Sequence, residues 1–157
     1  MRVIIQKVSQ ASVTVDNKLI SQIKKGYFLL VGISVNDTEV ELERVAKKVC
    51  GLRLFELNED DIHTNLWKKS IKDVKGEILS VSQFTLYAKT KKGTKPDFHR
   101  SQKSEIAQPL YEKFLAFLRR ELGSDDLVKD GQFGGMMSCA LTNEGPCTII
   151  LDTDETA

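Results

Sequence analysis

RVIIQKVSQASVTV, residues Arg2–Val15, is the stretch from which the fold prediction starts. Its valines and isoleucines are typical of a β-strand. A second run of this kind, GYFLLVGISV (26–35), follows after DNKLISQIKK (16–25), in which the Asp16-Asn17 step predicts a turn. The chain is therefore expected to begin with two strands joined by a segment that contains a turn.

Further strands are predicted later in the chain. LRLFEL (52–57) is short, whereas GEILSVSQFTLYA (76–88) is apolar almost throughout, as in strands buried on both faces. The C-terminal LVKDGQFGGMMSCALTNEGPCTIILD (127–152) predicts two or three closing strands with glycines at the bends.

Two helices are expected between these strands. The first should start at Asp37 and Thr38, with Glu41 at capping-box spacing, and end at Gly51. The second should cover roughly 104–122, and Pro109 indicates that its regular part begins close to that residue. The predicted apolar faces are Leu42, Val45, Ala46 and Val49 on the first helix, and Ile106, Leu110, Phe114, Phe117 and Leu118 on the second.

Length and composition fit one folded domain. The chain has 157 residues, of which 41% are hydrophobic and 29% charged, as in ordinary globular proteins. A domain of this size buries roughly two-thirds of the surface that its unfolded chain exposes. We therefore expect a single α+β domain over residues 1–157, with a frayed acidic tail at about 153–157.

The three cysteines argue against disulfides and structural metal. Cys50, Cys139 and Cys147 are odd in number and form no C-x-x-C pair, and no histidine is spaced for zinc. The N-terminus begins directly with a strand pattern, and no segment approaches 18 apolar residues. The sequence predicts a cytoplasmic protein without a cofactor or a membrane span.

Positive charge is concentrated in one part of the chain although the net charge is only +1. Between Lys68 and Lys103 there are ten basic residues against three acidic ones, an excess of seven. Such a segment could contact phosphates, or it could be a solvated loop and strand face. Charge alone does not distinguish these two interpretations.

Familiar catalytic arrangements are missing from the sequence. His63 and His99 lie in no metal-ligand spacing and are interpreted as surface or loop histidines. GQFGG (131–135) follows a strand without leading into a helix, so it is no dinucleotide-binding motif, and no G-x-S-x-G elbow is present. Cys147 lies in an apolar run, which predicts a buried, inert thiol.

The Gly145-Pro146 step interrupts the last strand pattern. Proline cannot donate to a strand ladder, so the step must be a turn, a bulge or an edge. One interpretation is a hairpin turn at 143–146 that links strands 136–143 and 147–152. The other is that the Gly-Pro backbone is itself a recognition element.

Two short stretches carry the functional prediction, SQFTLYA (82–88) and TNEGPCT (142–148). Taken singly, Ser82 and Thr85 could be core and cap residues. Together the stretches resemble the paired motifs S-Q-F-T-L and N-x-G-P-x-T of the D-aminoacyl-tRNA deacylases. The resemblance extends nearly end to end, through the opening strand, KGTKPDFHR (92–100), AQPLYEKF (107–114) and GQFGGMM (131–137).

Three positions depart from the pattern of that family. Met136 stands where relatives often carry an acidic residue, Lys7 where arginine is frequent, and Cys147 where valine is frequent. None of the three belongs to the two motifs. We expect these departures to affect substrate binding or dimer contacts rather than the activity.

The resemblance implies a fold, a reaction and an assembly. The fold would be mixed, mostly antiparallel sheets forming a barrel-like core with two helices packed outside. The reaction would be hydrolysis of the ester between a D-amino acid and the terminal ribose of tRNA, without cofactor or metal. The assembly would be a homodimer in which a cis Gly145-Pro146 bond reaches into the partner's active site and excludes L side chains, a filter that glycine should pass.

The resemblance also assigns residue roles. Backbone N–H groups around Phe84 and Thr85 would stabilise the oxyanion, with no obligatory side-chain nucleophile. Two alternatives stay open: a nucleic-acid-binding module without hydrolysis, and a small acyl hydrolase with Thr85 or Ser82 as nucleophile. The implied site residues are Ser82, Gln83, Phe84 and Thr85 for catalysis, Gly145 and Pro146 for chiral selectivity, Asn143, Thr148, Phe133 and Met137 in support, and Lys89, Lys91, Lys92, Lys95 and Arg100 for tRNA binding.

Overall fold

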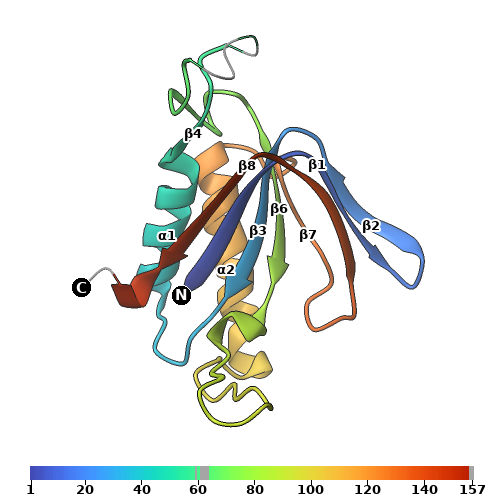
Figure 1. Cartoon of the computed structure of the whole chain (residues 1–157), viewed down its shortest axis with the longest axis vertical. Helices are drawn as coiled ribbons and strands as arrows, with labels where there is room; N and C mark the ends of the chain where they lie inside the picture. Colours follow the sequence, from blue (N-terminus) through green and yellow to red (C-terminus); the bar gives the residue numbers. More distant parts are fainter. Residues whose placement is uncertain (59, 61–63, 156–157) are drawn as a thin grey trace.

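The computed structural model describes residues 1–58, 60 and 64–155 (Figure 1). The strands are β1 (Arg2–Val15), β2 (Lys18–Ile23), β3 (Gly26–Gly32), β4 (Arg53–Phe55), β5 (Lys69–Ser70), β6 (Glu77–Ser82), β7 (Val128–Asp130) and β8 (Ser138–Asp152). The helices are α1 (Glu39–Gly51) and α2 (Ser104–Leu122), with two 3-10 turns, η1 (Phe84–Tyr87) and η2 (Thr153–Glu155).

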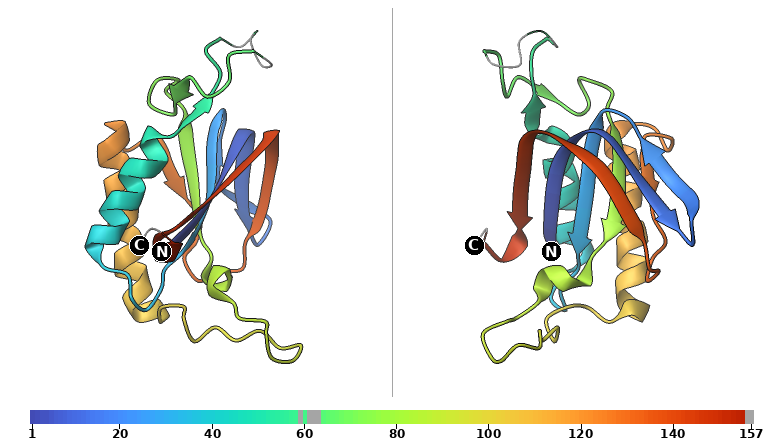
Figure 2. Two further views of the ribbon diagram at one scale, coloured as in Figure 1. Left: turned by 60° about the vertical axis from the view of Figure 1, so that its left-hand side comes forward. Right: turned by 45° about the vertical axis from the view of Figure 1, so that its right-hand side comes forward.

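The long strand β1 organises the main sheet. One of its edges pairs with β8 along nearly the whole length, and the other pairs first with β3 and then with β2, all antiparallel. β3, β6 and β7 continue the sheet in parallel, while β4 and β5 form a separate short pair. The sheet curls strongly, with both helices on one face (Figure 2). The predicted α+β fold, a mixed and barrel-like sheet with two helices outside, is confirmed.

Two apolar clusters hold these layers together. The larger one joins α1 and α2 to the face of the sheet that carries Ile5, Leu29 and Ile78, all fully buried. The smaller one fills the inside of the curl, around Phe28 and Leu79. Strands β3 and β6 are therefore buried on both faces, as the apolar character of β6 predicts.

The first helix agrees with its prediction in detail. Thr38 is the N-cap, and Thr38 and Glu41 form the complete capping box. The predicted residues Leu42, Val45, Ala46 and Val49 are all buried. Asp16 and Asn17 have φ values of 48° and 62°, which confirms the turn and matches the tight hairpin turn that joins β1 to β2.

The second helix corrects two expectations. It is regular from Ser104, with Pro109 inside it, because Pro109 and Glu105 are exposed and water can bind the Glu105 carbonyl that proline leaves unpaired. The buried stripe is also rotated from the predicted one, since Ile106 is 51% exposed. The buried residues of α2 are Ala107, Tyr111, Phe114, Leu115 and Leu118.

Two strand predictions and the prediction of a frayed tail also change. The segment 76–88 is a strand only to Ser82, after which the chain turns into η1. No hairpin forms at 143–146, because β8 runs through the Gly-Pro step as one strand paired with β1. At the end of the chain, Thr153–Glu155 form η2, and Thr153 N donates to Met1 O at 2.9 Å, so these tail residues are not frayed. Residues 156–157 of that tail lie outside the described residues.

Candidate active site

The SQFTLY stretch forms a tight turn at the end of β6. Gln83 N donates to Val31 O at 2.8 Å, which fixes where the turn leaves the sheet. The first backbone bond of the turn is Leu86 N to Gln83 O, so the N–H groups of Phe84 and Thr85 precede it. Phe84 is 55% exposed and Thr85 is exposed, so this end of the turn faces solvent.

The Thr85 hydroxyl lies next to an amide. Gln83 Nε2 donates a hydrogen bond to Thr85 Oγ1. An amide nitrogen cannot accept a proton from the hydroxyl, so this partner does not activate Thr85 as a nucleophile. The geometry favours the backbone of the turn over the side chain of Thr85.

Arg2 contacts both the main chain and a side chain of the η1 turn. Its Nη1 donates to Leu86 O at 2.9 Å, its Nε donates to Asp152 at 2.6 Å, and its guanidinium lies 4.8 Å from the centre of the buried Tyr87 ring. The position of η1 is thus tied to β1 and to the end of β8. Arg2 carries no recognisable sequence motif. The pairing of β1 with β3, and of β3 with β6, brings it to the turn, and the pairing of β1 with β8 brings Asp152 to it.

The basic loop after η1 packs against the turn. Ser101 Oγ donates to Phe84 O at 2.8 Å, and the Phe84 and Phe98 rings meet edge to face at 5.0 Å. Reciprocal backbone bonds between Lys89 and Asp97 close the loop. Within it, the predicted residues Lys89, Lys91, Lys92 and Lys95 are all exposed.

Two other polar residues of this loop, Arg100 and His99, have partners. Arg100 forms an ion pair with Asp154 and lies 5.7 Å from the centre of the Tyr87 ring, so it is part of the support of η1. His99 is an exposed loop histidine, as predicted, and contacts Asp97. The other histidine, His63, lies outside the described residues.

The basic segment 68–103 is not one continuous surface. Lys68–Lys75 precede β6, and Lys89–Lys103 follow η1 at the opposite end of that strand. The five steps along β6 from Glu77 to Ser82 separate the two groups by about 17 Å at about 3.3 Å per residue. Lys72 also pairs with Glu121 at 2.7 Å. Only the second group lies beside η1.

The 131–137 segment follows β7 at the same end of the sheet as η1, because β6 and β7 are parallel. The Phe133 ring packs against Tyr111, with centroids 5.8 Å apart, and Tyr111 donates to Ser80 on β6 at 3.0 Å. Met137 packs against the inner cluster of the curl. Both predicted supporting residues therefore pack against the apolar clusters.

The Gly145-Pro146 step forms a wide bulge in β8. Gln6 pairs with Thr148 and Val8 pairs with Asn143, so the four residues 144–147 lie opposite the single residue Lys7. The Gly145-Pro146 peptide bond is cis, and both residues are exposed. Gly145 has φ +116°, a conformation that L side chains rarely adopt.

Asn143 closes the base of this bulge. In the amide orientation that satisfies all its contacts, Nδ2 donates to Lys7 O at 2.9 Å and to Cys147 O at 3.2 Å. Its Oδ1 then accepts from Gln6 at 3.1 Å and from the Thr148 hydroxyl at 3.0 Å. The predicted supporting residues Asn143 and Thr148 are thus brought together at the bulge.

The two motifs lie at opposite ends of the sheet. The bulge is level with Gly26 and Tyr27 on β3, which pair with the start of β6 at Glu77 and Ile78, whereas Ser82 ends β6. Five residues along β6 and three strand spacings across the sheet correspond to about 20 Å. Figure 1 shows the bend of β8 at the top and the turn after β6 at the bottom. One chain alone does not bring Gly145-Pro146 to Phe84 and Thr85.

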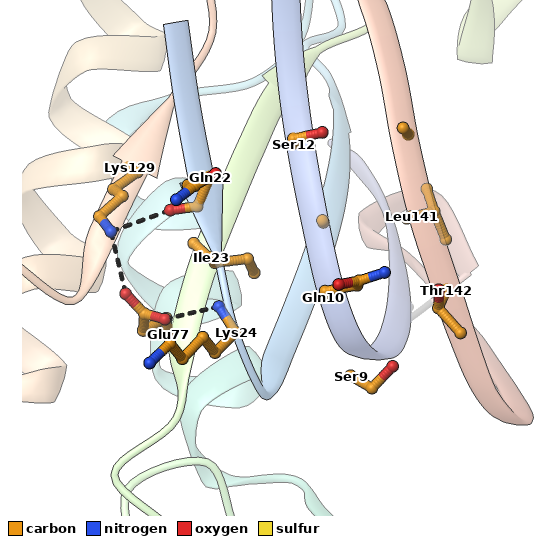
Figure 3. Close-up of a pocket in the computed structure, with 12 residues that line it drawn as sticks. Ser9, Gln10, Ser12, Gln22, Ile23, Lys24, Glu77, Lys129, Leu141 and Thr142 are labelled. Atoms are coloured by element: carbon orange, nitrogen blue, oxygen red, sulfur yellow. Dashed lines mark hydrogen bonds and ion pairs between the residues drawn. The ribbon is translucent and has the colours of Figure 1, made fainter. Parts of the chain in front are cut away.

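A polar hollow of about 550 Å³ lies elsewhere, between β1, β2 and β8 (Figure 3). Lys129 Nζ there contacts Glu77 at 3.0 Å and Gln22 O at 2.9 Å, and Glu77 also accepts from Lys24 N at 2.7 Å. The hollow contains no residue of η1 or of the Gly-Pro bulge. It is therefore not the candidate active site.

The thiols offer no nucleophile. Cys147 is 9% exposed, and burial raises the pKa of its thiol, as it also raises that of Cys139. Burial raises the pKa of Cys50 to about 12. The predicted burial of Cys147 is confirmed, and the raised pKa of its thiol disfavours the reactive thiolate. Among the described residues, no three or more His, Cys, Asp or Glu side chains are grouped to hold a metal, and no helix is long and apolar enough to cross a membrane.

Comparison with known proteins gives a consistent result. The sequence profile of the D-Tyr-tRNA(Tyr) deacylase family matches residues 4–152. The D-aminoacyl-tRNA deacylase of Saccharomyces cerevisiae is 64% identical over 155 residues, covering 99% of this chain and 100% of that protein. The D-aminoacyl-tRNA deacylase of Schizosaccharomyces pombe is 46% identical, with the same coverage.

Two solved structures share the fold. One, described as c-Myc DNA Unwinding Element Binding Protein, has a TM-score of 0.88 and 44% identity, covering 98% of this chain and 99% of that chain. The other, a probable eukaryotic D-amino acid tRNA deacylase, has a TM-score of 0.83 and 21% identity, covering 96% of this chain and 97% of that chain. At this lower identity the second similarity concerns the fold alone.

Proposed function

Because the chain belongs to the D-Tyr-tRNA(Tyr) deacylase family, we propose that it hydrolyses the ester between a D-amino acid and the 3′-terminal ribose of tRNA. Water attacks the ester carbonyl, the bond to the ribose oxygen breaks, and that oxygen leaves with a proton as part of free tRNA. The reaction would serve chiral proofreading in translation and the recycling of tRNA in the cytoplasm.

The backbone of η1 supplies the proposed chemistry. The N–H groups of Phe84 and Thr85 precede the first bond of the turn and lie at its exposed end, where they can donate to the developing oxyanion. One such donor typically contributes about 3–4 kcal/mol to catalysis. An aminoacyl ester is already an activated acyl group, so positioning and the substrate's own 2′-hydroxyl can complete the reaction without a side-chain nucleophile.

The observation that carries the proposal is the separation of the two motifs. The Gly145-Pro146 bulge is exposed about 20 Å from the η1 turn of its own chain. A homodimer would bring the bulge of one chain to the turn of the other and so form two active sites at the interface. There the backbone of Gly145 and Pro146 would occupy the space that an L side chain needs.

Steric exclusion has a consequence for glycine. Glycine has no side chain to exclude, so we expect glycyl-tRNA to be hydrolysed as well. The measurement is the fraction of intact glycyl-tRNA after prolonged incubation with enzyme that cleaves D-tyrosyl-tRNA. Intact glycyl-tRNA would argue against exclusion as the basis of selectivity.

The exposed lysines of the loop after η1 would bind tRNA phosphates. Lys89, Lys91, Lys92 and Lys95 share the end of the sheet that carries the proposed oxyanion donors. Arg100 is already bound to Asp154, so its contribution would be to hold the loop. A nucleic-acid-binding protein without hydrolysis is the second candidate, favoured by the 44% identical solved structure of a c-Myc DNA Unwinding Element Binding Protein.

One experiment separates these functions. Hydrolysis of D-tyrosyl-tRNA and L-tyrosyl-tRNA is measured with the wild-type protein and with Thr85→Ala. We expect D-selective cleavage by both proteins, because the backbone donors remain. Cleavage lost only in the variant would make Thr85 the nucleophile, and no cleavage by either protein would favour the binding module.

A further inference from the structure

We propose that Glu56 is a positioning residue that acts through Lys7 to hold the Gly145-Pro146 bulge in the place where it discriminates D from L substrates. This inference rests on the proposed function. Glu56 belongs to neither motif and lies just after β4, far from the bulge in sequence.

Lys7 is the residue of β1 that faces the bulge. It is the single β1 residue opposite residues 144–147, so the ladder offers it no regular partner on β8. Its carbonyl instead accepts from the Asn143 amide at 2.9 Å. The main chain of Lys7 is therefore attached to the base of the bulge.

The side chain of Lys7 is held by Glu56 inside the protein. Lys7 Nζ donates to both carboxylate oxygens, at 2.9 Å and 2.8 Å, and the two side chains are only 8% and 6% exposed. Burial opposes ionisation of Glu56, but the hydrogen bonds from Lys7, a backbone hydrogen bond and the charges of Lys7 and Lys25 together outweigh it, so the pKa of Glu56 lies below its usual value. A two-oxygen contact of this kind fixes the direction of the ammonium group.

Glu144, the first residue of the bulge, completes the arrangement. Its Oε2 lies 3.9 Å from Lys7 Nζ and, within the described part of the chain, is buried without a hydrogen-bond partner. The Lys7 ammonium group is therefore the positive charge that attracts the Glu144 carboxylate, and its position determines where that carboxylate lies. Because Glu144 directly precedes Gly145, a displaced Lys7 would displace the bulge.

Glu56 is itself firmly anchored. The preceding residue, Phe55, is fully buried and stacks on Tyr27 with centroids 5.3 Å apart. The Phe55 ring also lies 5.3 Å from Lys7 Nζ. The core thus fixes the carboxylate, the carboxylate fixes Lys7, and Lys7 contacts the bulge through both its main chain and its side chain.

The test compares selectivity with stability. The homodimer carrying Glu56→Gln is assayed for kcat/KM on D-tyrosyl-tRNA and L-tyrosyl-tRNA, beside Lys7→Arg and the control Val49→Ala. Val49 is fully buried in α1 and belongs neither to the bulge nor to the Lys7–Glu56 pair, so its truncation should lower stability without removing that pair. We expect Glu56→Gln to lower the D/L ratio of kcat/KM about tenfold or more, because misplacing a positioning group by 1 Å can cost about a hundredfold.

Lys7→Arg keeps the cation and should retain most of the ratio, and Val49→Ala should lower Tm with the ratio unchanged. An unchanged ratio in Glu56→Gln, with a Tm loss like that of Val49→Ala, would overturn the inference while leaving the D-selective wild-type activity intact.

Hydrogen exchange provides a readout that does not depend on hydrolysis. Glu56→Gln should accelerate amide exchange in the peptide covering 143–148 at least severalfold, and Val49→Ala should not do so selectively. If the wild-type protein hydrolyses neither substrate, the proposed function fails. In that case exchange at 143–148 still decides whether Glu56 holds the bulge, and equal exchange in both variants would refute it.

Discussion

Replacing Gly145 by alanine tests the role of the bulge most directly. Gly145 has φ +116°, and a Cβ built there would lie 2.9 Å from Cys147 N and 3.4 Å from Cys147 Cβ. A non-glycine residue in such a conformation costs about 1–3 kcal/mol, and the close contact with a backbone atom forces a further shift of the kind that costs about 1–3 kcal/mol in a packed site. We expect Gly145→Ala to lower the free energy of unfolding by about 2–6 kcal/mol, the sum of these two costs.

Gly123→Ala is a matched control for this strain. Gly123 ends α2 with φ +71°, and nothing lies within 4 Å of a Cβ built there. Its replacement should cost only the conformational part, about 1–2 kcal/mol. For a protein of this length each kcal/mol lowers Tm by about 2–4 °C, so the two variants are separable by thermal unfolding at one protein concentration.

The deacylation assay completes the test. In Gly145→Ala the added methyl group and the shifted bulge should reduce cleavage of D-tyrosyl-tRNA or its preference over L-tyrosyl-tRNA, whereas Gly123→Ala should keep both. Equal stability losses would show that the contact with Cys147 is easily relieved. If Gly145→Ala cleaves D-tyrosyl-tRNA at the wild-type rate and with the wild-type preference over L-tyrosyl-tRNA, the assignment of the bulge as the chiral filter is refuted.

Three other predictions concern charge. Charge reversal at Lys91 and Lys92 should weaken tRNA binding and reduce the slope of log K against log salt by about 1–2, as measured by a salt titration; an unchanged slope would remove these lysines from the interface. Arg2→Ala should lower kcat more than it changes KM, because the Leu86 carbonyl loses its anchor, and a pure KM effect would contradict this. The folded-state pKa of Glu56 lies below its unfolded value, so its stabilisation is present above the unfolded pKa and is lost as pH falls through the folded pKa. The wild-type free energy of unfolding should therefore fall more steeply below about pH 4.3 than that of Glu56→Gln, and parallel curves would argue against the ion pair.

Local signals in the sequence predicted local structure well. The capping box at Thr38 and Glu41 fixed the start of α1, and the continuous apolar run at 76–82 indicated a strand buried on both faces. The strand ended at Ser82, earlier than its apolar pattern suggested. The apolar residues that follow belong to η1, in which only Tyr87 is buried. The apolar residues of this short 3-10 turn continue the apolar run of β6, so the sequence pattern does not show where the strand ends and the turn begins.

Long-range pairing was the part that the sequence did not reveal. A Gly-Pro step between two apolar runs is equally compatible with a hairpin and with a bulge, and only the pairing of both runs with β1 decides for the bulge. The same pairing places Lys7 opposite the bulge, and the pairings of β1 with β3 and of β3 with β6 place Arg2 next to η1. Neither contact is encoded in spacing along the chain, so both residues lay outside the predicted site.

The course of β8 connects the bulge with the proposed dimer. Within the described residues β8 pairs with β1 alone, so its other edge is unpaired along a strand of 15 residues. Ile150 on this strand is 67% exposed, and long exposed edges with apolar side chains favour pairing with another chain unless something interrupts or covers them. The bulge interrupts this edge and at the same time projects Gly145 and Pro146 outward. A second copy that binds the bulge would also cover part of β8. The same contact would then complete the active site and cover the exposed strand edge.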